Sequence, residues 1–238
     1  MKMSANPIQA CIDVLVSPSS AFAAVKEKKG WSWLPFILLV GTTVAVFMYY
    51  YSVVDFAWLK EQMINGMVAS GKTDEEIAGF SDNFSVNVMK WATVIGGSVG
   101  IIVINLLVAL YYHLVTKVSA KNEFKFTDWY AFTWWVGMPA FVAMLTSALV
   151  IFFASNGQVT LQDIQPTSLN SLIFSVEQGS PWFNLLEGIS LFSFWSIAVA
   201  SIGMSTWLKV DNQKALTIAA APFVIIYGCW ALYIAFLA

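Results

Sequence analysis

Five long stretches of this chain contain no lysine, arginine, aspartate or glutamate, and they constrain the fold more than any other feature. They cover residues 30–54, 91–116, 129–162, 188–208 and 215–238. Each is long enough to cross the hydrocarbon core of a bilayer as an α-helix, which takes ~20 residues. Hydrophobic residues make up 58% of the chain and charged residues 11%, against roughly 45–50% and about 25% in soluble domains. The sequence therefore predicts an all-α integral membrane protein, a bundle of five transmembrane helices.

We expect the spans near residues 33–54, 91–115, 130–153, 185–207 and 215–237. Residues 31–238 would form the membrane domain, with residues 55–90 and 154–184 as its two outer loops. Within the first loop, the pattern Thr73-Asp74-Glu75-Glu76 is typical of a capping box and predicts the start of a helix.

Residues 1–30 are predicted to form cytoplasmic amphipathic helices that lie at the membrane interface. Asn6-Pro7 and Ser17-Pro18 each place a capping residue before proline, which favours a helix start. The spacing of apolar residues then predicts one helical face, made of Ile8, Cys11, Ile12 and Leu15. The second helix offers a contact surface for lipid or a partner, made of Phe22, Lys26, Lys28 and Lys29. The segment is either an anchor for the first span or a docking surface for a cytoplasmic protein partner.

The distribution of lysine predicts the orientation. Nine lysines fall on the side of the N-terminus: Lys2, Lys26, Lys28, Lys29, Lys117, Lys121, Lys125, Lys209 and Lys214. Lys60, Lys72 and Lys90 fall on the other side, together with most of the acidic residues. The positive-inside rule then places the N-terminus in the cytoplasm. Five spans place the C-terminus on the outer side of a cell inner (cytoplasmic) membrane.

Polar residues inside the spans are candidate functional groups, because burying them in lipid is costly. The candidates are Asn105, His113, Asn184 and Glu187. Glu187 either holds a proton, a cation or a polar substrate, or accepts a hydrogen bond from a neighbouring helix. Asn105 is also explained as a bridge between helices, and His113 as a hydrogen-bonded or interfacial histidine. At ~1.5 Å rise per residue, His113 and Glu187 are expected to lie more than ~20 Å apart.

Small residues and prolines mark the expected helix contacts. One small-residue seam holds Gly96 and Gly100, and a second holds Ser193, Ser196, Ala200 and Gly203. Such residues allow close packing within the chain or in a homo-oligomer. Pro139 and Pro222 lie within the third and fifth spans and are predicted to kink them.

Several function classes are disfavoured by what the sequence lacks. It has no arginine, no phosphate-binding loop and only two cysteines, Cys11 and Cys229. No nucleophile–base pair, carboxylate dyad or set of metal ligands stands at a useful spacing. We therefore predict no enzyme activity, no cofactor, no metal and no nucleic-acid partner.

Several segments resemble the Ypt-interacting-protein (Yip) domain family of bacterial membrane proteins. These are residues 17–22 with Lys26-Glu27-Lys28, Gly30-Trp31 and Pro35, residues 70–77, residues 126–131 through Pro139, residues 191–196 with Ile202-Gly203, and Lys214-Ala215. The resemblance implies five spans, a cytoplasmic N-terminus and no catalytic residues. Eukaryotic members are adaptors that bind prenylated Rab-type GTPases, and their Asp-Leu-Tyr-Gly-Pro motif has no match here.

Two functions remain open from the sequence. The first is a scaffold, adaptor or membrane-organising protein that contacts lipids, a cytoplasmic partner or a second copy of itself. The alternative is a transporter or channel for a small solute, ion or lipid that uses Asn105, His113 and Glu187.

Overall fold

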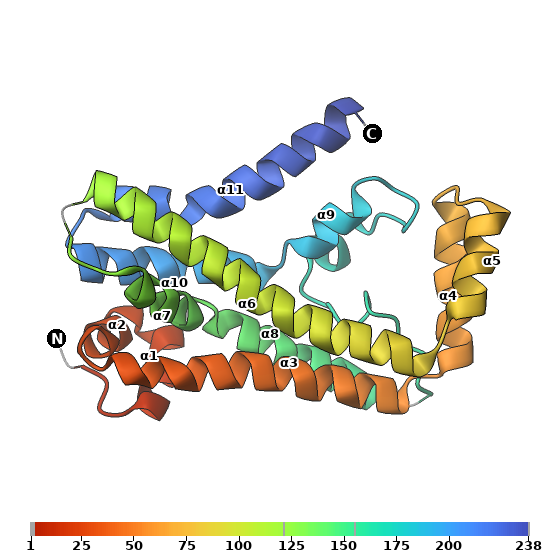
Figure 1. Cartoon of the computed structure of the whole chain (residues 1–238), viewed down its shortest axis with the longest axis horizontal. Helices are drawn as coiled ribbons and strands as arrows, with labels where there is room; N and C mark the ends of the chain where they lie inside the picture. The colour runs from red at the N-terminus through yellow and green to blue at the C-terminus, as the bar shows by residue number, and fades with distance from the viewer. Residues whose placement is uncertain (1–2, 121, 155, 238) are drawn as a thin grey trace. The chain divides into compact units, whose positions relative to one another are not determined.

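The computed structural model describes residues 3–120, 122–154 and 156–237. Lys2 and Lys121, which entered the orientation argument, lie outside these residues. The regular elements of the described part are helices, apart from one isolated bridge between Ser168 and Ser190 (Figure 1). The helices are α1 (Pro7–Val16), α2 (Pro18–Glu27), η1 (Lys29–Ser32), α3 (Trp33–Val53), α4 (Phe56–Ala69), α5 (Asp74–Asn83), α6 (Val86–Ser119), α7 (Phe126–Val136), α8 (Met138–Phe153), η2 (Asn170–Phe174), α9 (Phe183–Gly188), α10 (Leu191–Leu208) and α11 (Asn212–Leu237).

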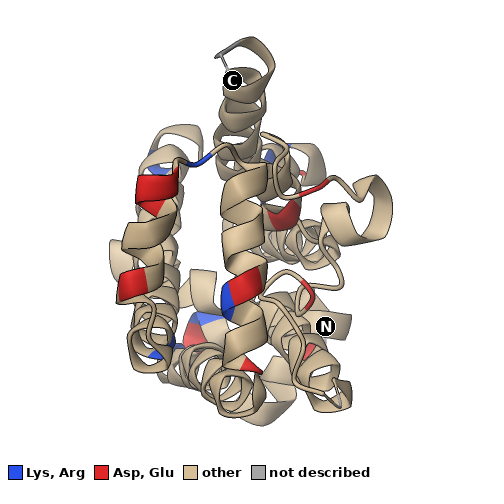
Figure 2. Cartoon of the chain, turned by 90° about the vertical axis from the view of Figure 1, so that its right-hand side faces the viewer, with Lys and Arg blue, Asp and Glu red and all other residues tan. Residues whose placement is uncertain are grey.

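Five helical segments of the described chain are long and apolar enough to cross a membrane, which confirms the predicted fold class. They are Lys29–Val53, Val86–Ser119, Phe126–Phe153, Leu191–Leu208 and Asn212–Phe236. In Figure 2, Lys, Asp and Glu are coloured and form a small minority among the other residues, which are tan. A helix suits this environment because it satisfies its backbone hydrogen bonds within its own segment.

The chain divides into two compact units, each with its own core. Unit 1 comprises residues 1–42, 99–142 and 192–229, and unit 2 comprises residues 43–98, 143–191 and 230–238. Unit 1 therefore contains α1, α2, α7 and α10 almost entirely, whereas unit 2 contains α4, α5, α9 and the segment from 154 to 190.

The core of unit 1 is built from large aromatic side chains. Trp129, Phe132 and Trp135 of α7 are fully buried and pack with Phe22 of α2. The Phe22 and Phe132 ring centroids are 4.7 Å apart, and those of Phe132 and Trp207 are 5.0 Å apart. Aromatic pairs at this spacing add to the free energy of area burial. The N-terminal helices are thus part of a folded core.

The core of unit 2 joins α3 and α8 to the segment that follows α8. Tyr50 is fully buried, and its hydroxyl donates to the carbonyl of Val159 at 2.9 Å. The hydroxyl of Ser147 donates to the carbonyl of Ile164 at 2.5 Å. Because these buried backbone carbonyls would otherwise lack partners, the two hydrogen bonds fix the path of residues 159–164.

The first outer loop is helical, as its capping motif predicts. Thr73 caps α5: its hydroxyl accepts from the Glu76 backbone N–H at 3.3 Å, and the Glu76 carboxylate accepts from the Thr73 N–H at 2.9 Å. The predicted capping box is therefore present.

The two prolines interrupt their spans in different ways. Pro139 is the second residue of α8 and follows Gly137, the C-cap of α7, so the third span consists of two successive helices. Pro222 lies inside α11, where it removes one backbone hydrogen bond.

Candidate functional site

The first candidate site is the contact surface predicted on the N-terminal helices, and the structure corrects one of its members. Phe22 is 0% exposed, and its carbonyl accepts a hydrogen bond from the indole N–H of Trp207 at 2.9 Å. It therefore contributes to the core of unit 1 and does not face lipid or a partner. The sequence indicated an apolar face but not that α7 and α10 would cover it.

The apolar face of α1 is also divided differently from its prediction. Ala10, Cys11 and Val14 are buried, whereas Ile8 and Ile12 are exposed. The cause is the packing of α1 against α2 and α7, which covers the side of the helix with the small residues. The exposed residues Ile8, Ile12 and Val16 follow one another at four-residue spacing, and we call them the α1 stripe.

Lys29 pairs with a buried carboxylate. Its Nζ lies 2.6 Å from Oδ1 of Asp128, a residue that is 6% exposed. The other oxygen, Oδ2, accepts from the backbone N–H of Lys125 at 2.9 Å, as expected for an acidic residue in the first turn of α7. The pair ties η1 to the start of α7. Asp128 was not among the predicted site residues. The sequence feature that could have indicated it is its position as the single acidic residue between Lys125 and the third uncharged stretch.

Lys26 and Lys28 differ in their surroundings. The Nζ of Lys26 donates to the carbonyl of Trp207 at 3.3 Å and lies 5.2 Å from the ring centroid of Phe124. Lys28, the C-cap of α2, is exposed. The lysines of this segment thus include one held against the core and one open to solvent or headgroups.

Asn105 and His113 lie on α6 in unit 1. The Asn105 amide donates to the carbonyl of Ile101 on its own helix at 2.9 Å. The His113 ring lies 6.3 Å from that of Phe126, and its Nδ1 is buried without a hydrogen-bond partner. The two side chains therefore have different neighbours, and no hydrogen bond joins them.

Asn184 and Glu187 lie on α9, before the fourth candidate span. That span begins at Leu191 and not near residue 185, because α9 ends at Gly188 and extended residues follow it. Glu187 is 8% exposed, and its Oε1 accepts from Nδ2 of Asn170 at 3.0 Å. Its other oxygen, Oε2, is buried without a hydrogen-bond partner.

Asn170 was missed because it lies in a segment that the sequence described only as a polar loop. Its side chain donates to the carbonyl of Val176 at 3.2 Å and accepts from the Val176 N–H at 2.8 Å. It thereby closes the π-helical turn η2 and positions the amide that meets Glu187. Nothing local in the sequence distinguishes Asn170 from the neighbouring polar residues.

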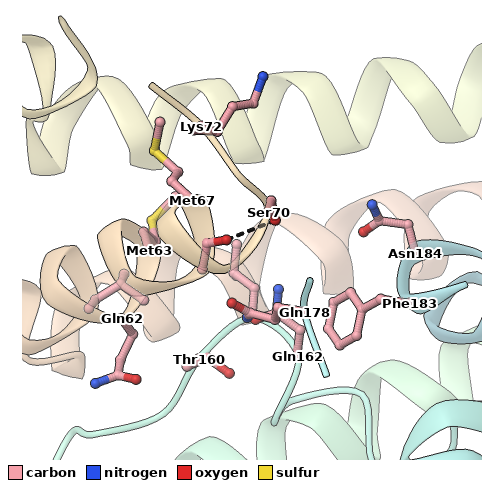
Figure 3. Close-up of a pocket in the computed structure, with 13 residues that line it drawn as sticks. Gln62, Met63, Met67, Ser70, Lys72, Thr160, Gln162, Gln178, Phe183 and Asn184 are labelled. Carbon is pink, nitrogen blue, oxygen red and sulfur yellow. Dashed lines mark hydrogen bonds between the residues drawn. The ribbon is translucent and has the colours of Figure 1, made fainter. Parts of the chain in front are cut away.

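Asn184 faces a different environment, a cavity of about 270 Å³ in unit 2 (Figure 3). Amide side chains line it from three segments, and Met63 and Met67 of α4 supply apolar surface. The amides are Gln62, Gln162, Gln178 and Asn184. Gly66 lies directly against the Gln178 side chain, so a larger residue would intrude there. The residues that line it offer neutral hydrogen-bonding groups and one ammonium group, that of Lys72, but no carboxylate or histidine. Glu187 does not line it.

The two small-residue seams have different surroundings. Ala200 is buried in the core of unit 1, and a Cβ added at Gly203 would lie 2.6 Å from the Phe22 ring. Ser193 and Ser196 on the same helix are partly buried. By contrast, nothing lies within 4 Å of a Cβ at Gly96 or Gly100. In unit 2, it is Gly97 that packs internally, against Phe47 and Thr43.

No group of three or more metal-ligating side chains is present among the described residues.

Five apolar helices with a folded N-terminal helix pair define a multi-pass helical membrane protein. The family model of the Yip1 domain matches residues 12–233, nearly the whole chain, and the chain belongs to this family. No curated protein and no solved structure matches the chain significantly.

Proposed function

We propose that this protein is a non-enzymatic scaffold or adaptor of the inner membrane, with its N-terminal helices on the cytoplasmic side. One observation carries the proposal: a buried indole hydrogen bond fixes α2 to α10, a 2.6 Å ion pair fixes η1 to α7, and α1 packs against α2 and α7. Helices fixed in this way present a surface of constant shape. A surface that is already ordered loses less conformational entropy when it binds a partner.

The α1 stripe and Lys28 are among the exposed residues of that surface. Ile8 and Val16 are 67% and 75% exposed, although the opposite face of α1 is buried. Exposed apolar residues on a helix pair that also exposes a lysine suit the boundary between headgroups and acyl chains, or the apolar patch of a partner protein. Such a surface suits contact with a cytoplasmic protein, a second copy of the chain or the lipid itself.

The charge of the two units supports the proposed orientation. Unit 1 holds nine of the twelve lysines and five acidic residues, whereas unit 2 holds three lysines and nine acidic residues. The positive-inside rule assigns the lysine-rich segments to the cytoplasm.

Transport of a small solute or ion is the second candidate, and the unpaired Oε2 of Glu187 favours it. A buried carboxylate oxygen without a partner is able to take a proton or a cation. The amide of Asn105, however, donates to a carbonyl of its own helix, so it has fewer free hydrogen-bonding groups with which to bind a substrate.

The two functions are separated by native mass spectrometry of the protein in mild detergent, with co-purifying species kept bound. A scaffold is expected to retain a stoichiometric protein partner or to form a defined homo-oligomer. The triple substitution Ile8→Ser, Ile12→Ser and Val16→Ser should abolish that assembly, whereas Val118→Ser, which changes another exposed apolar residue of unit 1, should preserve it. A monomer without a partner would contradict the scaffold. A retained solute that is lost in Glu187→Gln would establish transport instead.

A further inference from the structure

An aromatic cavity of about 610 Å³ lies in unit 1 beside the Lys29–Asp128 pair. Its apolar lining comes from three helices: Trp33 and Phe36 of α3, Ile102 of α6, and Tyr130 and Trp134 of α7. The rings of Phe36 and Trp134 meet edge to face, with centroids 4.8 Å apart. The volume falls in the range of about 300–1,000 Å³ that is usual for ligand pockets.

A second cavity of unit 1, of about 450 Å³, is basic. Lys26, Lys29 and Lys209 line it, together with Asn122 and the indole of Trp207. Lys26 is held in place by the Trp207 carbonyl and the Phe124 ring. Lys209 has a positive φ of 55°, which directs the chain sharply at the end of α10. Three lysines, two from the N-terminal helices and one from the end of α10, therefore line one space.

The two cavities meet at the ion pair. Lys29 and Asp128 line both of them, and they also line a void of about 10 Å³ that shares Ser32 with the first cavity and Lys26 with the second. Both carboxylate oxygens of Asp128 already accept hydrogen bonds. An ammonium group has three N–H donors, and the Nζ of Lys29 uses one of them on Asp128. The pair thus orients Lys29 at the junction without using up its capacity to bind an anion.

We propose that these adjacent cavities bind one anionic phospholipid, with its phosphodiester on the lysines and an acyl chain in the aromatic cavity. This goes beyond the scaffold function and does not depend on it. An anion alone would not need the aromatic cavity, and an apolar molecule alone would not need the lysines. A phospholipid has both parts, joined over a short distance.

The charge of the basic cavity distinguishes among headgroups. Its carboxylates are Asp128, which is already paired, and Glu123, which is exposed. A zwitterionic headgroup would bring its own ammonium group next to three others. A headgroup such as phosphatidylglycerol carries the negative charge without that repulsion, and each nearby lysine favours it.

The test measures lipid binding to the purified full chain by native mass spectrometry. The protein is titrated with dioleoyl phosphatidylglycerol and with dioleoyl phosphatidylcholine, which differ only in the headgroup. Phosphatidylglycerol should bind in a one-to-one complex about tenfold more tightly than phosphatidylcholine. The double variant Lys26→Gln, Lys209→Gln should bind it about tenfold more weakly, whereas the matched variant Lys117→Gln, Lys125→Gln, which removes two exposed lysines outside both cavities, should bind it as the wild type does.

The apolar half of the site is tested separately. Ile102→Trp fills the aromatic cavity without a change of charge and should also weaken binding, whereas Ile104→Trp, at an exposed position on the same helix, should not. Equal binding of the two lipids, equal losses in the matched variants, or displacement of the lipid by glycerol phosphate at the same concentration would each overturn the proposal. The last result would indicate a site for free phosphate. Unchanged thermal unfolding of the variants in detergent confirms that a loss of binding is not a loss of fold.

Discussion

The carboxylate of Glu187 has a hydrogen-bond partner for only one of its two buried oxygens, and that partner is the amide of Asn170. This geometry costs free energy if the carboxylate is ionised, because a buried charge needs full pairing. Asn170 is doubly important, since it also holds both backbone groups of Val176.

We expect Asn170→Leu to destabilise the protein by about 1–3 kcal/mol, because it leaves buried polar groups unpaired. Glu187→Gln should have a smaller effect or raise stability, since the amide still accepts from Asn170 and carries no charge. Thermal unfolding in detergent measures both. If Glu187→Gln were the more damaging change, Oε2 would have a partner such as a bound cation.

Cys11 is predicted to resist thiol reagents in the folded protein. Burial raises the pKa of its thiol from 9.0 to about 11, and only the thiolate is nucleophilic. At neutral pH its thiolate fraction is therefore about a hundredfold lower than that of an unperturbed cysteine. The labelling rate should rise about tenfold per pH unit up to about pH 11.

A Cys229→Ser variant isolates Cys11 for this measurement, and the unfolded chain provides the reference. Because the folded state holds the proton more tightly, this residue's contribution to stability is present below pH 9 and is lost as the pH rises toward 11. Rapid maleimide labelling of the folded variant at neutral pH would show that α1 does not stay packed.

At the scale of helices, the contact between α10 and α2 depends on a glycine. A Cβ at Gly203 would lie 2.6 Å from the Phe22 ring and 2.7 Å from the Phe132 ring, both of them fully buried. Gly203→Ala should therefore destabilise the protein by about 1–3 kcal/mol through overpacking. Gly228→Ala on α11 meets nothing within 4 Å and should be neutral or stabilising. Thermal unfolding of the two variants compares their stabilities. Equal stabilities would contradict the close packing of Gly203 against the Phe22 and Phe132 rings.

The capped helix α5 gives a prediction for local stability. Thr73→Ala removes the side chain that caps the helix and should cost about 1 kcal/mol locally. Hydrogen exchange of residues 74–83 should become faster, with the rest of the chain unchanged. Thr73→Ser keeps the hydroxyl and should keep the protection. If both variants exchanged like the wild type, the cap would not limit the opening of α5.

Helices were more predictable than contacts, and the reason is physical. In a bilayer, a single uncharged stretch of 20 or more residues satisfies its backbone hydrogen bonds within its own segment only as a helix. Composition and length were therefore sufficient to predict the five spans. The capping box was predictable because it is local. The pairing of Glu187 with Asn170 and the burial of Phe22 depend on segments distant in sequence. No periodicity encodes them, and so the contact surface was only partly predicted.

At the scale of the whole molecule, the segregation of charge should determine how the chain inserts. Four of the seven described lysines of unit 1 lie at or next to a helix end: Lys117 in the last turn of α6, Lys125 at the N-cap of α7, Lys209 directly after α10 and Lys214 in the first turn of α11. Lysines at such positions have the strongest effect on orientation. The acidic residues of α4 and α5 have little effect under the same rule, so the lysines should dominate.

We therefore expect the N-terminus in the cytoplasm and the C-terminus on the outer side. A tag at the N-terminus of the full chain should be protected from an impermeant reagent in intact cells, whereas the same tag at the C-terminus should react. Exchanging Lys117, Lys125, Lys209 and Lys214 for Gln should produce a mixed population, because the charge difference between the two sides is largely removed. The matched change is Lys60, Lys72 and Lys90 to Gln, which should leave the orientation as it was. Protection of both tags would mean an even number of crossings and would require one of the five apolar helices to lie outside the bilayer core.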